Sequence, residues 1–171
     1  MTSDSSDITI RLATTADVKA LGRLGALLVE THYEFDRLRF IAPTSQTADR
    51  YGAFLETQLN APSVLVFVAE RNGEVIGYTY AGVEGFDYMS LRGPAGALYD
   101  IVVDPAHRGR GVGRLLLDAT LAELKARGAP RVVLSTAEQN ESAQRLFARA
   151  GFRRTMIEMT RELNDEPRVS S

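Results

Sequence analysis

The sequence predicts an α/β (α+β) fold in which a mixed β-sheet packs against helices. Strand-like and helix-like segments alternate along the chain in the order β-α-α-β-β-β-α-β-α-β. Residues 63–71 and 98–103 are nearly continuous apolar runs, which are typical of central strands covered on both faces. Residues 111–127 are apolar on more than one side, as expected for a helix that packs against several elements.

The N-terminal part predicts one strand followed by two helices. Residues 8–13 alternate apolar and polar side chains, which indicates a half-buried strand. Thr14 precedes Asp17 by three residues, a spacing typical of a capping box at the start of a helix. A second helix is expected at about 45–60.

The rest of the chain predicts five more strands, of which 63–71 is the first, and two more helices. Asn72-Gly73 favours a hairpin turn into a strand at about 74–83, and residues 84–97 are expected to form a loop. After the buried strand 98–103 and the helix 111–127, three elements remain. They are a strand at 131–136, a helix over 140–150 and a strand at about 152–162.

Composition indicates an ordinary globular protein. The chain has 171 residues, with 20 Lys+Arg against 22 Asp+Glu and a net charge of −2. We expect a disordered N-terminus (1–7), a single domain (8–163) and a polar C-terminal tail (164–171). The near-neutral balance gives no electrostatic reason to bind nucleic acid or an anionic membrane.

Several other classes are disfavoured. The longest apolar run is six residues and the N-terminus is polar and acidic, so neither a transmembrane helix nor a signal peptide is expected, and the predicted location is cytoplasmic. The absence of cysteine excludes disulfides, thiolate metal sites and a Cys nucleophile. His32 and His107 lack metal-ligand spacing, so no metal is expected.

A glycine-rich turn lies between the buried strand and the long helix. Glycines occupy alternate positions: Gly109, Gly111 and Gly113. Glycine permits left-handed backbone angles and close approach of a ligand. Free N–H groups at a helix start bind anions, and three arginines add positive charge: Arg108, Arg110 and Arg114. The turn therefore predicts a phosphate site.

The identity of the phosphate ligand is narrowed by what the turn lacks. Gly113-Arg114-Leu115 does not supply the Gly-Lys-Ser/Thr of a nucleotide triphosphatase, and the dinucleotide fingerprint would need glycine at 114. A tight turn with solvated arginines is the non-functional alternative. The density of glycine and arginine favours binding.

The glycine-rich turn resembles the acyl-CoA signature of the GNAT superfamily of acetyl-CoA-dependent N-acetyltransferases. The signature is Arg/Gln-x-x-Gly-x-Gly/Ala, and the turn reads Arg108-Gly109-Arg110-Gly111-Val112-Gly113. Residues 98–105 are similar to the family's fourth strand, and Asn140 followed by Gly151-Phe152 resembles its next block. The resemblance covers about 8–163. It implies a GNAT-like, largely antiparallel sheet with splayed central strands and helices on both faces.

The resemblance also implies acetyl-CoA as co-substrate. The loop amides would surround its pyrophosphate, and the fourth strand and Asn140 would contact its pantetheine arm. The implied binding residues are Ile101, Val102, Val103, Arg108, Gly109, Arg110, Gly111, Val112, Gly113 and Asn140. Asn140 could equally be a plain helix N-cap, and both roles are compatible. The Val102 N–H would hold the oxyanion, and residues 32–40 and 84–97 would line the acceptor pocket; for 32–40 an aromatic cluster at the core edge is the alternative.

Attack by an amine on a thioester requires a neutral nitrogen. A lysine-like amine has a pKa of about 10.4, so roughly one molecule in 2,500 is neutral at pH 7, a penalty of about 4.6 kcal/mol. A carboxylate could accept the proton. Asp100, just before the pantetheine segment, is the catalytic candidate, although it could instead satisfy backbone groups near a bulge. Glu84 is a second candidate.

One position departs from the family pattern. Many members carry a tyrosine that protonates the departing CoA thiolate, and Phe147 stands there in this chain. A thiol has a pKa near 8.5, so a thiolate can leave without strong assistance. We assign no proton donor, although four tyrosines are conceivable: Tyr78, Tyr80, Tyr88 and Tyr99.

We therefore predict an N-acetyltransferase that moves an acetyl group from acetyl-CoA to a primary amine of a small molecule or protein by direct attack. Two alternatives remain: a catalytically silent acyl-CoA-binding sensor or regulatory module, and a phosphate-binding domain for another nucleotide. The predicted partner is an amine substrate whose identity stays open. A homodimer is possible.

Overall fold

The computed structural model describes residues 7–164. The predicted disordered N-terminus and polar tail lie outside these residues, except for Asp7 and Asn164. The strands are β1 (Ile8–Leu12), β2 (Val64–Arg71), β3 (Glu74–Glu84), β4 (Ala95–Val103) and β5 (Val132–Leu134). The helices are α1 (Val18–Phe35), α2 (Thr47–Gln58), α3 (Val112–Ala126) and α4 (Glu141–Arg149), with short 3-10 turns at Thr15–Asp17 and Pro105–His107.

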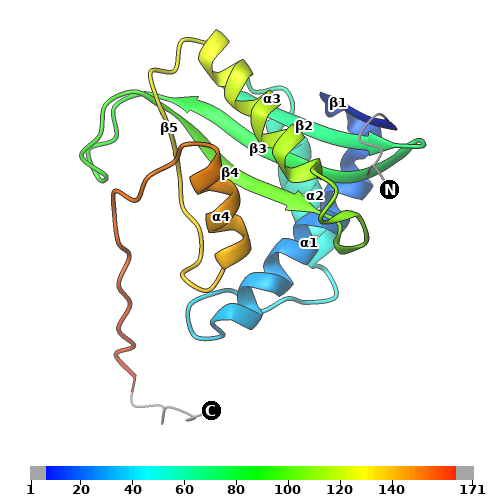
Figure 1. Cartoon of the computed structure of the whole chain (residues 1–171). Coiled ribbons are helices and arrows are strands. Elements are labelled where there is room, and N and C mark those ends of the chain that lie inside the picture. Colours follow the sequence, from blue (N-terminus) through cyan, green and yellow to red (C-terminus); the bar gives the residue numbers. More distant parts are fainter. Residues whose placement is uncertain (1–6, 165–171) are drawn as a thin grey trace.

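The strands form one sheet in the order β1-β2-β3-β4-β5. All neighbours are antiparallel except β4 and β5, which are parallel. Helices α1 and α2 cover one face, and α3 and α4 cover the other (Figure 1). The predicted mixed, largely antiparallel sheet with helices on both faces is confirmed. None of the helices in residues 7–164 is long and apolar enough to cross a membrane.

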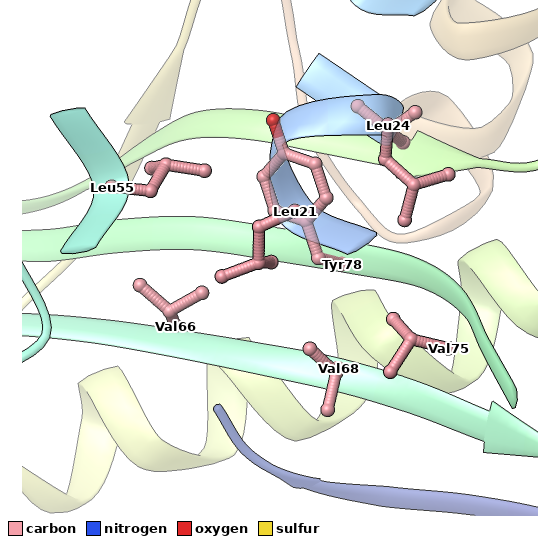
Figure 2. Packing of buried hydrophobic residues seen from close by; sticks show 8 residues of the cluster. Leu21, Leu24, Leu55, Val66, Val68, Val75 and Tyr78 are labelled. Carbon is pink, nitrogen blue, oxygen red and sulfur yellow. The ribbon is translucent and has the colours of Figure 1, made fainter. Parts of the chain in front are cut away.

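The core beneath α1 and α2 is built from aliphatic side chains and one tyrosine. Leu21 and Leu24 of α1 and Leu55 of α2 are fully buried against the sheet, and Tyr78 projects from β3 among them (Figure 2). The two helices cross closely at Gly22, where an added Cβ would lie 2.3 Å from the Ala48 carbonyl oxygen. This close packing holds α2 over the middle of the sheet.

The first helix is tied to the sheet edge by a buried carboxylate. Asp17 accepts a hydrogen bond from the Thr14 backbone N–H at 2.8 Å, as the predicted capping box requires. It also pairs with Arg11 of β1 at 2.8 Å, and Arg11 reaches Glu70 of β2 at 2.6 Å. The Arg11 hydrogen bonds lower the Asp17 pKa to about 2.

A β-bulge in β4 shapes the centre of the sheet. Tyr80 faces Asp100 and Ala81 faces Leu98, so Tyr99 is the extra residue. The Gly96 N–H donates to Arg131 on the β5 side, yet the Asp104 N–H, eight residues later, donates to Ile76 on the β3 side. In a regular strand both would face the same neighbour, so the bulge reverses the hydrogen-bonding sides.

This reversal opens a gap between the two parallel strands. Strand β5 pairs only with Gly96–Leu98. Beyond the bulge, alternation directs the N–H groups of Ile101 and Val103 away from β3 and into the gap. The Val102 N–H faces β3 instead, which counts against the expectation that it holds an oxyanion, whereas the Ile101 N–H faces the gap.

Three sequence-based predictions of secondary structure differ from the structure. The loop expected at 84–97 is shorter, because Glu84 ends β3 and residues 95–97 already belong to β4. The strand expected at 152–162 is wrong: residues 152–163 form no strand and run away from α4 (Figure 1). Met156, Ile157 and Met159 are 74–89% exposed there. A strand needs a hydrogen-bonding neighbour, and none of the described strands pairs with this segment. The strand expected at 131–136 is confined to Val132–Leu134.

Candidate active site

A pocket of about 320 Å³ lies between the helices α1 and α2 and the gap in the sheet. One end is formed by α1, the segment after it and β4; the other by β5, the loop after it and α4. The lining residues are Leu28, Val29, His32, Phe40, Ile41, Tyr51, Leu98, Tyr99, Asp100, Ile101, Leu134, Ser135, Thr136, Asn140, Ala143 and Phe147. Three residues predicted from the sequence to form the site therefore line one cavity: Asp100, Ile101 and Asn140.

Asp100 follows the bulge and is 8% exposed. Its Oδ2 accepts hydrogen bonds from the hydroxyls of Tyr51 (2.6 Å) and Tyr78 (2.9 Å), and no described residue donates to Oδ1. Burial raises the pKa of this carboxyl, while the two hydroxyls and the nearby His32 oppose that rise. A carboxylate with one oxygen held and a raised pKa is suited to accept a proton.

The tyrosines serve as hydrogen-bond donors. Burial raises the pKa of Tyr51 and of Tyr78, and the adjacent Asp100 raises both further, so both hydroxyls keep their protons. Tyr99 donates to Glu84, Tyr80 donates to Gln58, and Tyr88 is 84% exposed on a distant hairpin. None of the four tyrosines considered from the sequence is thereby placed as a proton donor to a thiolate.

Tyr51 is the site residue that reasoning from the sequence missed. It lies on α2, 49 positions before Asp100, and no local motif links the two. Gly25 of α1 makes room for its ring, because a Cβ at that position would lie 2.2 Å from Tyr51 Cδ1. The helix crossing thus determines where the hydroxyl lies.

The second carboxylate candidate is engaged elsewhere. Glu84 accepts from the Tyr99 hydroxyl and pairs with Arg92. The hairpin 85–94 projects from the end of the sheet, and no residue of 84–97 lines this pocket, so the structure gives no support to the expectation that this loop forms its wall. Its ends are pinned together by the Asp87–Arg92 bridge, which keeps it extended outward (Figure 1).

The segment 32–40 does reach the pocket. The His32 Nδ1 lies 2.8 Å from the Leu28 carbonyl oxygen, and the His32 ring packs edge-on against Phe40 at 5.0 Å between centroids. His32 and Phe40, with the neighbouring Ile41, line the pocket. The aromatic cluster considered from the sequence and the pocket wall are therefore the same group of side chains.

Phe147 lines the other end of the pocket. It is 6% exposed and packs against Phe152, with ring centroids 5.8 Å apart. Asn140 caps α4, since its Oδ1 accepts from the Ala143 N–H at 3.1 Å, and this confirms the capping role. Its side-chain Nδ2 has no hydrogen-bond partner among the described residues and can donate to a ligand.

The glycine-rich turn forms an open cradle at the start of α3. Gly109 and Gly111 have φ values of +74° and +81°, and a Cβ at either would meet no atom within 4 Å. Gly111 is the N-cap of α3, and no side chain caps the helix. The first amides of α3 are therefore available to an anion.

The arginines around this cradle differ in their roles. Arg108 Nε donates to the Val103 carbonyl oxygen at 3.1 Å, which holds the loop against the end of β4. Arg114 pairs with Asp118 at 2.9 Å and reaches the Arg149 carbonyl, so its charge is directed along α3 toward α4. Arg108 and Arg110 thus supply the positive charge at the loop itself. Within residues 7–164 no three His, Asp or Glu side chains are grouped to hold a metal ion.

The comparisons with known proteins agree with this geometry. The family model described as "Acetyltransferase (GNAT) family" matches residues 29–152. The chain belongs to the GNAT acetyltransferase family. GNAT membership assigns it to a family of acyltransferases and confirms the resemblance seen in the glycine-rich turn.

Curated relatives match part of this GNAT chain. A mycothiol acetyltransferase from Thermobispora bispora is 40% identical over 97 residues, which is 54% of this chain and 31% of that protein. One from Thermomonospora curvata is 36% identical over 94 residues, 55% of this chain and 29% of that protein. The match therefore covers less than a third of the length of either relative.

Solved structures share the GNAT fold over nearly the whole chain. A mutant of the BH1408 protein from Bacillus halodurans aligns with a TM-score of 0.78 at 22% identity, covering 91% of this chain and 99% of that one. An aminoglycoside N-acetyltransferase in complex with CoA aligns with a TM-score of 0.67 at 21% identity, covering 92% and 95%. At these identities the likeness establishes the fold.

Proposed function

We propose that this GNAT chain transfers an acetyl group from acetyl-CoA to a primary amine by direct attack, with Asp100 as the general base. The observation that carries the proposal is the buried Asp100 carboxylate, held through Oδ2 by Tyr51 and Tyr78, in a pocket that also opens on the sheet gap. The chain has no cysteine to form an acyl-enzyme, which favours a single direct transfer.

The groups around the gap fit acetyl-CoA. The open cradle at Gly109 and Gly111 and the uncapped start of α3 suit a pyrophosphate. The amides of Ile101 and Val103 and the amino group of Asn140 would contact the pantetheine arm. The chemistry that acetyl-CoA supplies is an activated acetyl thioester.

The chain's own residues would then act as follows. Asp100 Oδ1 receives a proton from the bound ammonium, because Oδ2 is already occupied by two hydroxyls. The Ile101 N–H faces the gap and stabilises negative charge on the carbonyl oxygen under attack. No side chain needs to protonate the leaving thiolate, whose thiol has a pKa of about 8.5, and this suits the apolar Phe147.

A thiol-release assay with acetyl-CoA and an amine panel tests the proposal. Asp100→Asn should lower the rate by about 10²-fold or more at pH 7. The loss should be smaller at pH 9, where about 100 times more of the amine is neutral. Glu84→Gln is the matched control, because Glu84 lies outside the pocket, and it should keep the wild-type rate.

An equal loss at both pH values for Asp100→Asn would assign Asp100 a structural role and contradict its role as base. Tight CoA binding without amine-dependent thiol release, for every amine in the panel, would instead favour an acyl-CoA sensor. Thermal stabilisation by ATP but not by CoA would refute the cofactor itself.

A further inference from the structure

Resting on the proposed function, we propose that the acceptor is a small monoamine: one primary ammonium on an apolar aliphatic or aromatic body. Three features of the pocket end formed by α1 and the segment after it carry this assignment. They are its single carboxylate, its apolar walls and its size.

The charge in the pocket matches one ammonium group. Asp100 is the only carboxylate among the described lining residues, and none of them is Lys or Arg. Its Oδ2 is occupied by Tyr51 and Tyr78, which leaves Oδ1 for one donor. A polyamine or an aminoglycoside would bring further ammonium groups into a space with no second carboxylate, at a high desolvation cost.

The walls facing Asp100 are apolar. Leu28 and Val29 come from α1, and the edge-on pair of His32 and Phe40 forms an aromatic surface beside Ile41. The His32 Nδ1 is already hydrogen-bonded to the Leu28 carbonyl oxygen. A sugar amine would lose the hydration of its hydroxyls here with few partners in return, whereas an apolar body gains from burial.

The size of the pocket limits the acceptor further. Its volume of about 320 Å³ is at the lower end for ligand sites and includes the end lined by Asn140 and Phe147, where the cofactor arm is proposed to lie. Only part of the volume is thus left for the acceptor. This favours a single short chain or one ring.

Thiol release with acetyl-CoA should rank amines accordingly. We expect kcat/KM for phenethylamine or 3-methylbutylamine to exceed that for spermidine, glucosamine and kanamycin by at least about tenfold, as expected for amines that leave no buried polar group unpaired. An equal or higher value for any of the last three would overturn the assignment. Nα-acetyl-lysine methylamide carries a single ammonium on a longer, peptide-like body; a value above both free amines would overturn the assignment of a small acceptor and identify a peptide lysine instead.

Calorimetry separates this inference from the proposed function. Phenethylamine and spermidine are titrated separately into the CoA-loaded protein, with no turnover. Tighter binding of phenethylamine supports the assignment even if no thiol is released in the assay above, a result that would refute only the proposed function. Tighter binding of spermidine overturns the assignment whether or not acetyl transfer occurs.

An added carboxylate tests the charge argument directly. Ile41 is 74% exposed at the edge of the pocket, so Ile41→Asp should leave the fold intact. It should raise the ratio of spermidine to phenethylamine kcat/KM about three- to fivefold, the gain expected for an exposed ion pair. Ile157→Asp, at an 84% exposed position outside the pocket, should leave the ratio unchanged. An unchanged ratio for Ile41→Asp would count against the assignment.

Discussion

Removing the Tyr51 hydroxyl should raise the pKa of Asp100. That hydroxyl donates to Asp100 Oδ2 at 2.6 Å in a buried site, and the bond favours the charged carboxylate. A hydrogen bond to a charged group contributes about 1.5–3 kcal/mol, and one pKa unit corresponds to about 1.4 kcal/mol. Tyr51→Phe should therefore move the Asp100 pKa upward by about one to two units.

The assay is the pH profile of kcat/KM for thiol release. Its acidic limb reports the base of the free enzyme, so in Tyr51→Phe the limb should move to higher pH by the same one to two units. Carboxyl carbon NMR of Asp100 provides a reading that does not depend on turnover. Tyr99→Phe is the control: its hydroxyl donates to Glu84, so the limb should not move. An unchanged or lowered Asp100 pKa in Tyr51→Phe would refute the reasoning.

Three further changes test other parts of the account. Gly25→Ala should displace the Tyr51 ring, because the new Cβ would lie 2.2 Å from that ring. We expect it to cost about 1–3 kcal/mol of stability and to shift the acidic limb as Tyr51→Phe does. An unchanged melting temperature together with an unmoved limb would contradict this. Gly111→Glu should weaken CoA binding at least 100-fold in calorimetry, by blocking the cradle and repelling the pyrophosphate. Gly73→Glu, with a similar φ of +79° in a distant hairpin, should bind CoA normally, and equal affinity in both variants would refute the cradle. Asp17→Ala should cost about 2 kcal/mol, or roughly 4–8 °C in Tm, since the pKa falls from 3.8 to about 2 on folding. That contribution is full above pH 4 and is lost as pH falls through 2, so the Tm difference between Asp17→Ala and wild type should narrow over that range. Glu141→Ala, which removes an exposed ion pair, is the control and should change Tm little.

The sequence predicted those parts of the fold that local patterns encode. Apolar runs identified β2 and β4, and glycine spacing identified the cradle before α3, because both depend on residues that are neighbours in the chain. The segment 152–163 was expected to form a strand but has no neighbouring strand to pair with, and its own residues cannot reveal a missing partner. A bulge near Asp100 was considered from the sequence, but the extra residue, Tyr99, could not be identified, since a bulge is a property of two strands in register.

The residues of the candidate site that belong to local motifs were predicted from the sequence, and those that depend on tertiary contacts were not. Asp100 and Asn140 were selected because each stands at a recognisable position in a motif. Tyr51 was not, because its contact with Asp100 depends on how α2 crosses α1 at Gly22 and Gly25. The hairpin 85–94 was expected to line the acceptor pocket, but it lies outside the pocket described above. Its own residues do not indicate the direction in which it extends from the sheet.

A crystal structure of the protein with CoA tests most directly whether the helix start and the sheet gap together aim a thioester at Asp100. We predict the pyrophosphate against the amides of residues 109–113, the pantetheine arm beside Ile101 and Val103, and the sulfur within reach of a group bound at Asp100 Oδ1. A pyrophosphate bound elsewhere, or side chains of β4 and β5 filling the gap, would contradict the account.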